Sequence, residues 1–144
     1  SPEGIEEALV EKSPYIDQVM LYNNQCTTTT ALIVPNRDSL RRYLKEKGMK
    51  AESVEGRTAA LQLIENELAR FKKGGEFQGM FPERWLPSSF AVLAEPFTEQ
   101  NQMINSTMKM VRPKIEKAYK ERIDYIYTSE GKATLNQQNI DSIF

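Results

Sequence analysis

Two segments rich in strand-forming residues lie close together near the start of the chain, and they constrain its fold most strongly. Gln18 to Tyr22 and Thr28 to Val34 are rich in valine, isoleucine, leucine and threonine, which favour pleated strands. Asn23 and Asn24 lie between them, and asparagine favours turns because it tolerates left-handed backbone conformations. The pattern therefore predicts an antiparallel hairpin.

Segments with helical periodicity surround this hairpin. Apolar residues recur at three- and four-residue spacing in four places, which predicts amphipathic helices. These helical segments are Ile5 to Leu9, Leu40 to Leu44, Leu61 to Phe71 and Pro113 to Tyr127. Phe90 to Ala94 is a third candidate strand. The sequence predicts a single α+β domain over residues 1–144, with a small two- to three-stranded antiparallel sheet flanked by helices.

Two parts of the chain have weaker patterns. Glu76 to Ser88 is irregular, and its aromatic residues Phe77, Phe81 and Trp85 are expected to belong to the core or to an inter-domain patch. They are a poor base-stacking platform, because such platforms usually lie on strands within a basic groove. The tail from Ser129 onward is expected to dock through its few apolar residues.

The composition excludes several classes of site. The 144 residues contain 19 Lys and Arg against 20 Asp and Glu, so the net charge is -1. This balance gives no reason to expect nucleic acid as a partner. The chain has no histidine, which excludes Ser-His and Cys-His catalysis and histidine-based metal sites. Cys26 is the single cysteine, so no internal disulfide can form and a reducing compartment is favoured.

A polar run before the last predicted helix places one lysine in a position that suits phosphate chemistry. Lys109 follows a loop of asparagine, glutamine, serine and threonine residues, and functional loops often have this character. A mobile ammonium presented in this way suits a site where phosphate charge develops during a reaction. The loop has no glycine, which excludes a phosphate-cradling P-loop.

The residues after Lys109 form a basic stretch that has more than one interpretation. The spacing of Lys117 and Glu121 favours a solvated helix face. The stretch could instead contact the phosphates of a nucleotide-bearing cofactor. A third interpretation is a free-standing module that binds a protein or RNA through this helix, although no aromatic RNA-binding strand motif is present.

Three stretches of the chain resemble those of a known family. Pro2 to Leu9 reads P-E-G-I-E-E-A-L, Ala31 to Asn36 reads A-L-I-V-P-N, and Pro96 to Arg112 begins P-F-T-E-Q-N. They are similar, in order, to a P-x-x-I-E-E-x-L helix, an A-L-I-V-P strand and an F-T-x-E-N-G-x-x-T-x-T-x-K-x-x-R motif. These motifs are those of the small C-terminal domain of long-chain fatty acid–CoA ligases, in the adenylate-forming enzyme superfamily.

The resemblance implies roles for individual residues. Lys109 matches the catalytic lysine of acyl-adenylate formation, Thr107 matches the second motif threonine, and Arg112 matches an arginine that supports the loop. Asn105 stands where the first threonine is usual, and Gln102 where glycine is usual. The loop from Asn101 to Met110 is expected to be exposed and poorly packed, because it must reach into a cleft of a partner domain.

The resemblance also implies an activity. The full enzyme would activate a long-chain fatty acid with MgATP, release pyrophosphate and transfer the acyl group to coenzyme A. ATP, Mg²⁺ and coenzyme A would be held mainly by a larger N-terminal adenylation domain of the same polypeptide, so the isolated chain is expected to bind no cofactor and to be inactive. A cytoplasmic location is expected, with peripheral membrane association left open. A ligase for another acid is an alternative, since nothing here sets the acyl length.

Overall fold

The predicted hairpin forms the centre of the fold. A computed structural model describes residues 2–144, and in it β1 (Ile16–Tyr22) pairs antiparallel with β2 (Thr30–Pro35). The connecting turn contains Asn24 with a φ of 42°, which is the left-handed backbone that asparagine tolerates. The hairpin prediction is therefore confirmed.

The third strand corrects the predicted antiparallel sheet. β3 (Ser89–Val92) pairs with the other side of β2, and this pairing is parallel. The connection between β2 and β3 contains α2 (Arg37–Glu46) and α3 (Val54–Ala69). A long helical crossover of this kind returns the chain to the same end of the sheet, as parallel pairing requires. The α+β class is confirmed, and the three-stranded sheet is mixed.

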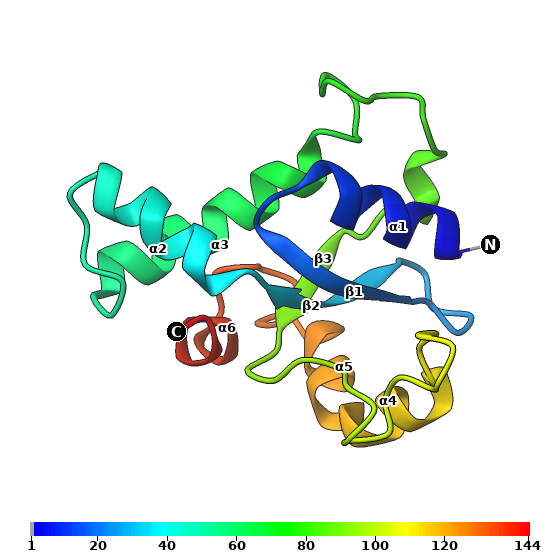
Figure 1. Cartoon of the computed structure of the whole chain (residues 1–144). Coiled ribbons are helices and arrows are strands. Elements are labelled where there is room, and N and C mark those ends of the chain that lie inside the picture. The colour runs from blue at the N-terminus through cyan, green and yellow to red at the C-terminus, as the bar shows by residue number, and fades with distance from the viewer. Residues whose placement is uncertain (1) are drawn as a thin grey trace.

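The remaining helices lie on both faces of the sheet. They are α1 (Pro2–Lys12), the 3-10 helix η1 (Glu83–Trp85), α4 (Arg112–Ala118), α5 (Lys120–Ile126) and α6 (Gln137–Ser142). Figure 1 shows α1 and α3 on one side of the sheet and α4 and α5 on the other. The domain therefore has three layers, with the sheet in the middle.

β2 is the strand that joins the two layers of helices. All six of its residues are buried. Successive side chains of a strand point to opposite faces, so both faces of β2 are covered. Ala31 and Ile33 belong to a core shared with α1, α2 and α3. Leu32 and Val34 belong to a second core, which includes Ile115 of α4 and the isoleucines of α5. The position of β2 therefore decides the packing on both sides of the sheet.

The helix predicted over Pro113 to Tyr127 is interrupted. Tyr119 has φ −111° and ψ 22°, and it separates α4 from α5. Ile115 and Ile123 on either side of the break are both buried in the second core. The break lets both half-helices turn their apolar sides to the sheet, and no glycine or proline in the sequence marks it.

The tail docks more firmly than its weak sequence pattern indicates. Asn139 of α6 is only 1% exposed, and its side chain bonds to the free edge of β3. Its Oδ1 accepts a hydrogen bond from the Val92 N–H at 3.0 Å, and its Nδ2 donates to the Phe90 carbonyl at 3.0 Å. Arg37 adds hydrogen bonds to the carbonyls of Ser142 and Ile143. The tail thus closes one side of the sheet.

Asn139→Ala should destabilise the domain, because it leaves buried backbone groups of Phe90 and Val92 without partners. The expected loss is about 3 kcal/mol in the free energy of unfolding, measured by urea denaturation. Gln137→Ala is the matched control, since Gln137 is exposed on the same helix and should change stability by less than about 0.5 kcal/mol. Equal losses in both variants would contradict this role of Asn139.

Candidate active site

The lysine loop, residues 101–110, is a paired ribbon rather than a loose segment. Ile104 and Met110 form an isolated antiparallel bridge, and the Val111 N–H donates to the Met103 carbonyl at 2.8 Å. Ile104 is 8% exposed and belongs to the second core. The expectation of a poorly packed loop is therefore wrong for its base, which is anchored in the core.

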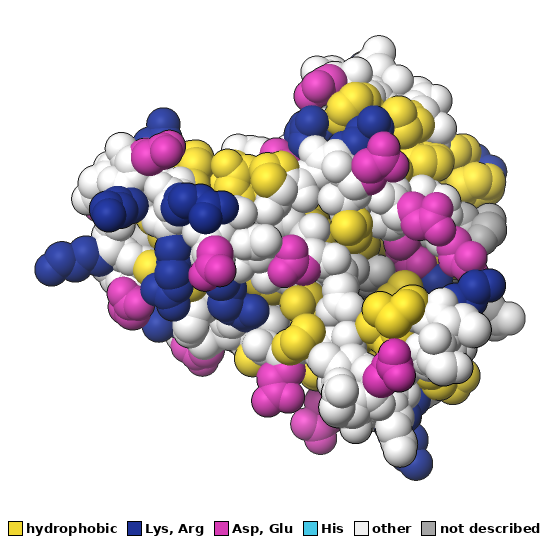
Figure 2. Space-filling model, in the orientation of Figure 1, with side chains coloured by type: hydrophobic (Ala, Val, Ile, Leu, Met, Phe, Trp, Pro, Cys, Tyr) yellow, Lys and Arg dark blue, Asp and Glu magenta, His cyan; other side chains and the backbone are white. Residues whose placement is uncertain are grey.

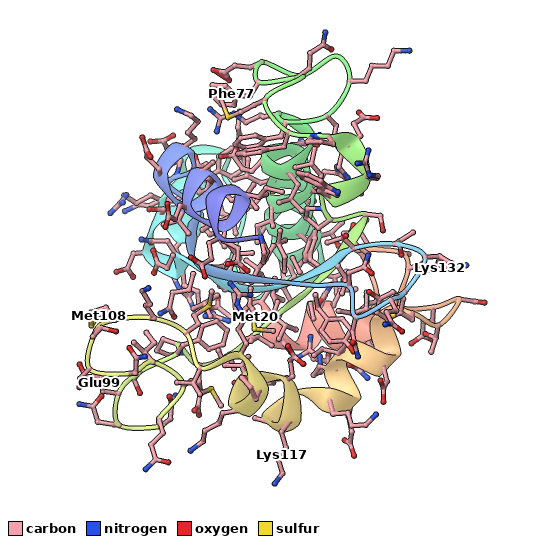
Figure 3. All side chains as sticks on the ribbon, turned by 90° about the vertical axis from the view of Figure 1, so that its right-hand side faces the viewer. Met20, Phe77, Glu99, Met108, Lys117 and Lys132 are labelled. Carbon is pink, nitrogen blue, oxygen red and sulfur yellow. The ribbon has the colours of Figure 1, made fainter. Side chains whose placement is uncertain are left out.

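The tip of the lysine loop is exposed, as expected. Asn105, Ser106, Thr107, Met108 and Lys109 are all exposed, and Met108 is 70% exposed. Figure 3 shows Met108 at the outer margin of the molecule, on a loop that projects beyond the sheet. The structure therefore combines an anchored base with a projecting tip.

The Asn105 side chain organises the turn at this tip. Its Oδ1 accepts hydrogen bonds from the Thr107 N–H at 3.0 Å, the Thr107 hydroxyl at 2.7 Å and the Lys109 N–H at 3.0 Å. The Asn105 N–H in turn donates to the Lys109 carbonyl at 2.9 Å. Three of the predicted site residues are thus brought together, and both backbone polar groups of Lys109 are held by Asn105.

Gln102 adopts a left-handed backbone conformation, which glycine adopts more readily than other residues. Its φ is 63°, in the left-handed region where an L side chain is strained. The Gln102 side-chain oxygen accepts a hydrogen bond from the Lys114 ammonium, and its N–H donates to the Glu99 carbonyl at 3.0 Å. The turn therefore forms here without the glycine that the motif usually has.

The Lys109 side chain is free to act outside the domain. Within the described range 2–144, its ammonium forms no ion pair or hydrogen bond, whereas its backbone is fixed. A lysine buried in an internal ion pair would have indicated a structural role. The geometry instead presents an exposed ammonium on a hydrogen-bonded turn.

Arg112 lies at the base of the loop and is bound to α1. Its guanidinium donates to both carboxylate oxygens of Glu6, with Nη1 2.9 Å from Oε2. Glu6 Oε2 also accepts the Leu21 N–H at 2.7 Å, and Glu6 is only 4% exposed. The hydrogen bond to Glu6 raises the pKa of Arg112 above its usual value, so the guanidinium stays charged. Sequence reasoning missed Glu6, although a glutamate between the core residues Ile5 and Leu9 was a signal.

A groove of about 460 Å³ separates α1 from the lysine loop. Its lining includes Glu3, Glu7, Val10, Glu11, Asp17, Met108 and Lys109. The carboxylates among these residues are exposed, and Figure 2 shows acidic side chains gathered over α1. The lining also contains Arg112, whose charge is offset by Glu6. Because the exposed carboxylates outnumber Lys109, the groove by itself is unfavourable for a nucleotide phosphate.

The basic stretch after Lys109 does not form one continuous cationic face. Lys120 pairs with Asp124 at 2.7 Å, instead of the predicted Lys117–Glu121 pair. Arg122 is directed inward, where its Nη2 donates to the Val92 carbonyl at 3.1 Å. Lys117 points away from the body of the molecule in Figure 3. The stretch is thus divided between solvated and structural side chains.

The aromatic residues of the segment from Glu76 to Ser88 are divided between the core and the surface. Phe77 and Phe81 pack on Phe71 with ring centroids 5.1 and 6.3 Å apart, respectively, so they extend the first core. Trp85 is 46% exposed, and the Arg84 guanidinium lies 5.2 Å from its ring centroid.

The described residues contain no group of three or more acidic or cysteine side chains placed to hold a metal ion. None of their helices is long and apolar enough to span a bilayer.

Comparison with known proteins shows similarity to one group of enzymes, although no protein-family model matches the chain. Long chain acyl-CoA synthetase 8 of Arabidopsis thaliana is 26% identical over 132 residues, covering 86% of this chain and 17% of that protein. Carboxylic acid reductase of Mycobacterium tuberculosis is 28% identical over 136 residues, covering 91% of this chain and 10% of that protein.

The solved structures agree with these sequence relatives. The adenylation domain of a carboxylate reductase from Mycobacterium chelonae has a TM-score of 0.65 and 28% identity, over 87% of this chain and 17% of that one. The chain therefore spans less than a fifth of the length of each of these three relatives.

Asn105→Ala should loosen the tip without unfolding the domain. The Thr107 and Lys109 amides would lose their acceptor, so their hydrogen exchange should become at least about tenfold faster. Ser106→Ala is the control, because Ser106 is exposed on the same turn, and it should leave these rates unchanged. NMR-detected exchange measures both variants, and unchanged Lys109 exchange in Asn105→Ala would refute this role.

Proposed function

We propose, from the homology of this chain to adenylate-forming enzymes, that it is the small C-terminal domain of an ATP-dependent long-chain fatty acid–CoA ligase. The relatives include a long chain acyl-CoA synthetase from Arabidopsis thaliana and long-chain-fatty-acid–CoA ligase 1 from Saccharomyces cerevisiae. The chain spans 17% and 18% of these two proteins. The rest of the enzyme would be a larger N-terminal domain that holds ATP, Mg²⁺ and the fatty acid.

The observation that carries this proposal is the unpaired ammonium of Lys109 on a projecting, internally bonded tip. A cation that acts in another domain must be accessible, and its backbone must be held so that the side chain can be aimed. Lys109 meets both conditions. The exposed carboxylates beside it support a site completed by a partner, because they disfavour phosphate binding by this domain alone.

In the first half-reaction, Lys109 would offset the repulsion between two anions. The fatty acid carboxylate attacks the α-phosphate of ATP, and both groups carry negative charge as they approach. An ammonium between the carboxylate and phosphate oxygens stabilises this charge most strongly in the transition state. Such positioning contributes about 3 kcal/mol, or roughly a hundredfold in rate.

In the second half-reaction, the cation has no equivalent task. A thiol displaces AMP from an already activated carbonyl, so Lys109 would be needed only while the acyl-adenylate forms. Rotation of the small domain between the steps would withdraw the lysine loop and present another face to coenzyme A. The internal bonding of the loop supports movement as a rigid part of the domain.

A second candidate function is suggested by the structural relatives. The adenylation domains of carboxylic acid reductases from Mycobacterium chelonae and Segniliparus rugosus have TM-scores of 0.65 and 0.59. Acyl-adenylate formation is common to both candidates, and they differ in the acyl acceptor. Supplying the full-length protein with fatty acid and ATP, and then with coenzyme A or a carrier-protein thiol, distinguishes them by which thioester forms.

The interaction-module alternative is less well supported. Lys120 forms an ion pair with Asp124, and Arg122 donates a hydrogen bond within the domain. Fewer free cations therefore face solvent than the sequence indicates. RNA binding with a steep salt dependence would favour this alternative.

Lys109→Ala in the full-length enzyme should separate the two half-reactions. Pyrophosphate release should fall about a hundredfold, whereas thioester formation from synthetic acyl-adenylate should stay near normal. Lys109→Arg should rescue only partly, because a planar fork replaces a compact ammonium. Lys117→Ala is the control, since it removes another exposed lysine, from α4.

Two outcomes would count against the role of Lys109. Equal loss in both assays would mean that Lys109 supports the fold or the domain motion in general. Loss in neither assay would remove it from the mechanism.

The isolated chain should bind ATP no more tightly than millimolar. The acidic groove beside Lys109 repels phosphate, and the remaining contacts would come from the larger domain. Calorimetric titration of the 144 residues with MgATP measures this affinity. Micromolar binding would contradict the division of the site between two domains.

A further inference from the structure

Glu6 connects three parts of the fold through one buried carboxylate. It lies on α1, accepts the Leu21 N–H of β1 at 2.7 Å, and accepts both Nη groups of Arg112 at the start of α4. Its side chain is 5% exposed and that of Arg112 is 27% exposed. A buried carboxylate with this set of donors fixes the geometry of its partners, because loss of any donor leaves charge desolvated.

The connection continues from Arg112 to Lys109 through the backbone. Val111, next to Arg112, donates to the Met103 carbonyl, and Met110 pairs with Ile104. Asn105 then bonds both backbone polar groups of Lys109. Both residues between Lys109 and Arg112, Met110 and Val111, are therefore paired across the loop, so a shift at Arg112 moves the tip.

We propose that Glu6 is a positioning residue for Lys109, acting through Arg112 to make α1 and the lysine loop move as one body. This inference rests on the proposed function, because it assigns Lys109 the task of reaching a reacting phosphate. Glu6 is buried, and its carboxylate oxygens are bound by Leu21 and Arg112. It sets where the ammonium stands relative to α1, and therefore how accurately Lys109 is placed when the domain turns.

A second ion pair in the same domain provides a matched control. Glu67 of α3 accepts from Ser13 Oγ at 2.6 Å and from Arg70 Nη1 at 3.1 Å, and its side chain is 12% exposed. Arg70 also donates to the Lys12 carbonyl at 2.7 Å. This pair binds the far end of α1 to the body of the domain, and neither Glu67 nor Arg70 lines the groove beside the lysine loop.

The experiment compares Glu6→Gln, Arg112→Lys and their double variant with Glu67→Gln in the full-length enzyme. Hydrogen exchange of a peptide covering residues 103–111 reports the loop directly, whatever the role of Lys109. Glu6→Gln should speed this exchange at least about tenfold and lower kcat for pyrophosphate release about tenfold. The rate from preformed acyl-adenylate and the KM for ATP should stay within about twofold, because Glu6 acts on placement rather than on binding.

The double variant tests whether Glu6 acts through Arg112. If it does, the double variant should be no slower in pyrophosphate release than the slower single variant. Glu67→Gln should lower the melting temperature comparably while leaving both exchange in residues 103–111 and the ratio of the two half-reactions unchanged. Loosening of the loop by Glu67→Gln as well would mean general destabilisation and would overturn the inference.

The outcomes also separate this inference from the proposed function. If Lys109→Ala impairs pyrophosphate release but Glu6→Gln changes neither loop exchange nor kcat, Glu6 has no positioning role and the proposed function stands. If Lys109→Ala has no effect on pyrophosphate release, the proposed function fails. Unchanged kcat in Glu6→Gln alongside faster loop exchange would reduce Glu6 to a structural residue.

Discussion

The burial of β2 on both of its faces is the constraint on which the rest of the structure depends. Ile33 and its neighbour Leu32 belong to different cores, and each core holds a separate group of helices. The first group contains α1, and the second contains α4 and the base of the lysine loop. Because a single strand supports both layers, β2 brings the base of the loop close to α1, and the Glu6–Arg112 pair then links the two directly.

Local features of the sequence predicted local features of the structure. The hairpin around Asn24 and the exposed position of Lys109 follow from residue types and short spacings. The parallel addition of β3 could not be predicted in this way, since it depends on how a two-helix connection returns to the sheet. The break at Tyr119 and the partner of Arg112 likewise depend on contacts between segments distant in sequence.

The lysine loop forms its turns without the glycine and the first threonine of the motif that it resembles. Gln102 adopts the left-handed backbone without being glycine, and Asn105 supplies one oxygen that holds both Thr107 and Lys109. A side-chain amide oxygen has two lone pairs and a longer reach than a hydroxyl. The two departures from the motif that the chain resembles therefore lie in neighbouring turns, and in each turn the backbone is held by a hydrogen bond.

The side chains of Asn139 and Glu6 each bond to the backbone of an edge strand, and both therefore affect whether the sheet can be extended. Asn139 occupies the outer edge of β3, and Glu6 accepts the Leu21 N–H at the outer edge of β1. Open strand edges are templates for pairing with other chains. Here an incoming strand would have to displace a buried asparagine on one side or a buried ion pair on the other. The rotation proposed above would thus change the face that the domain presents without offering its sheet for extension.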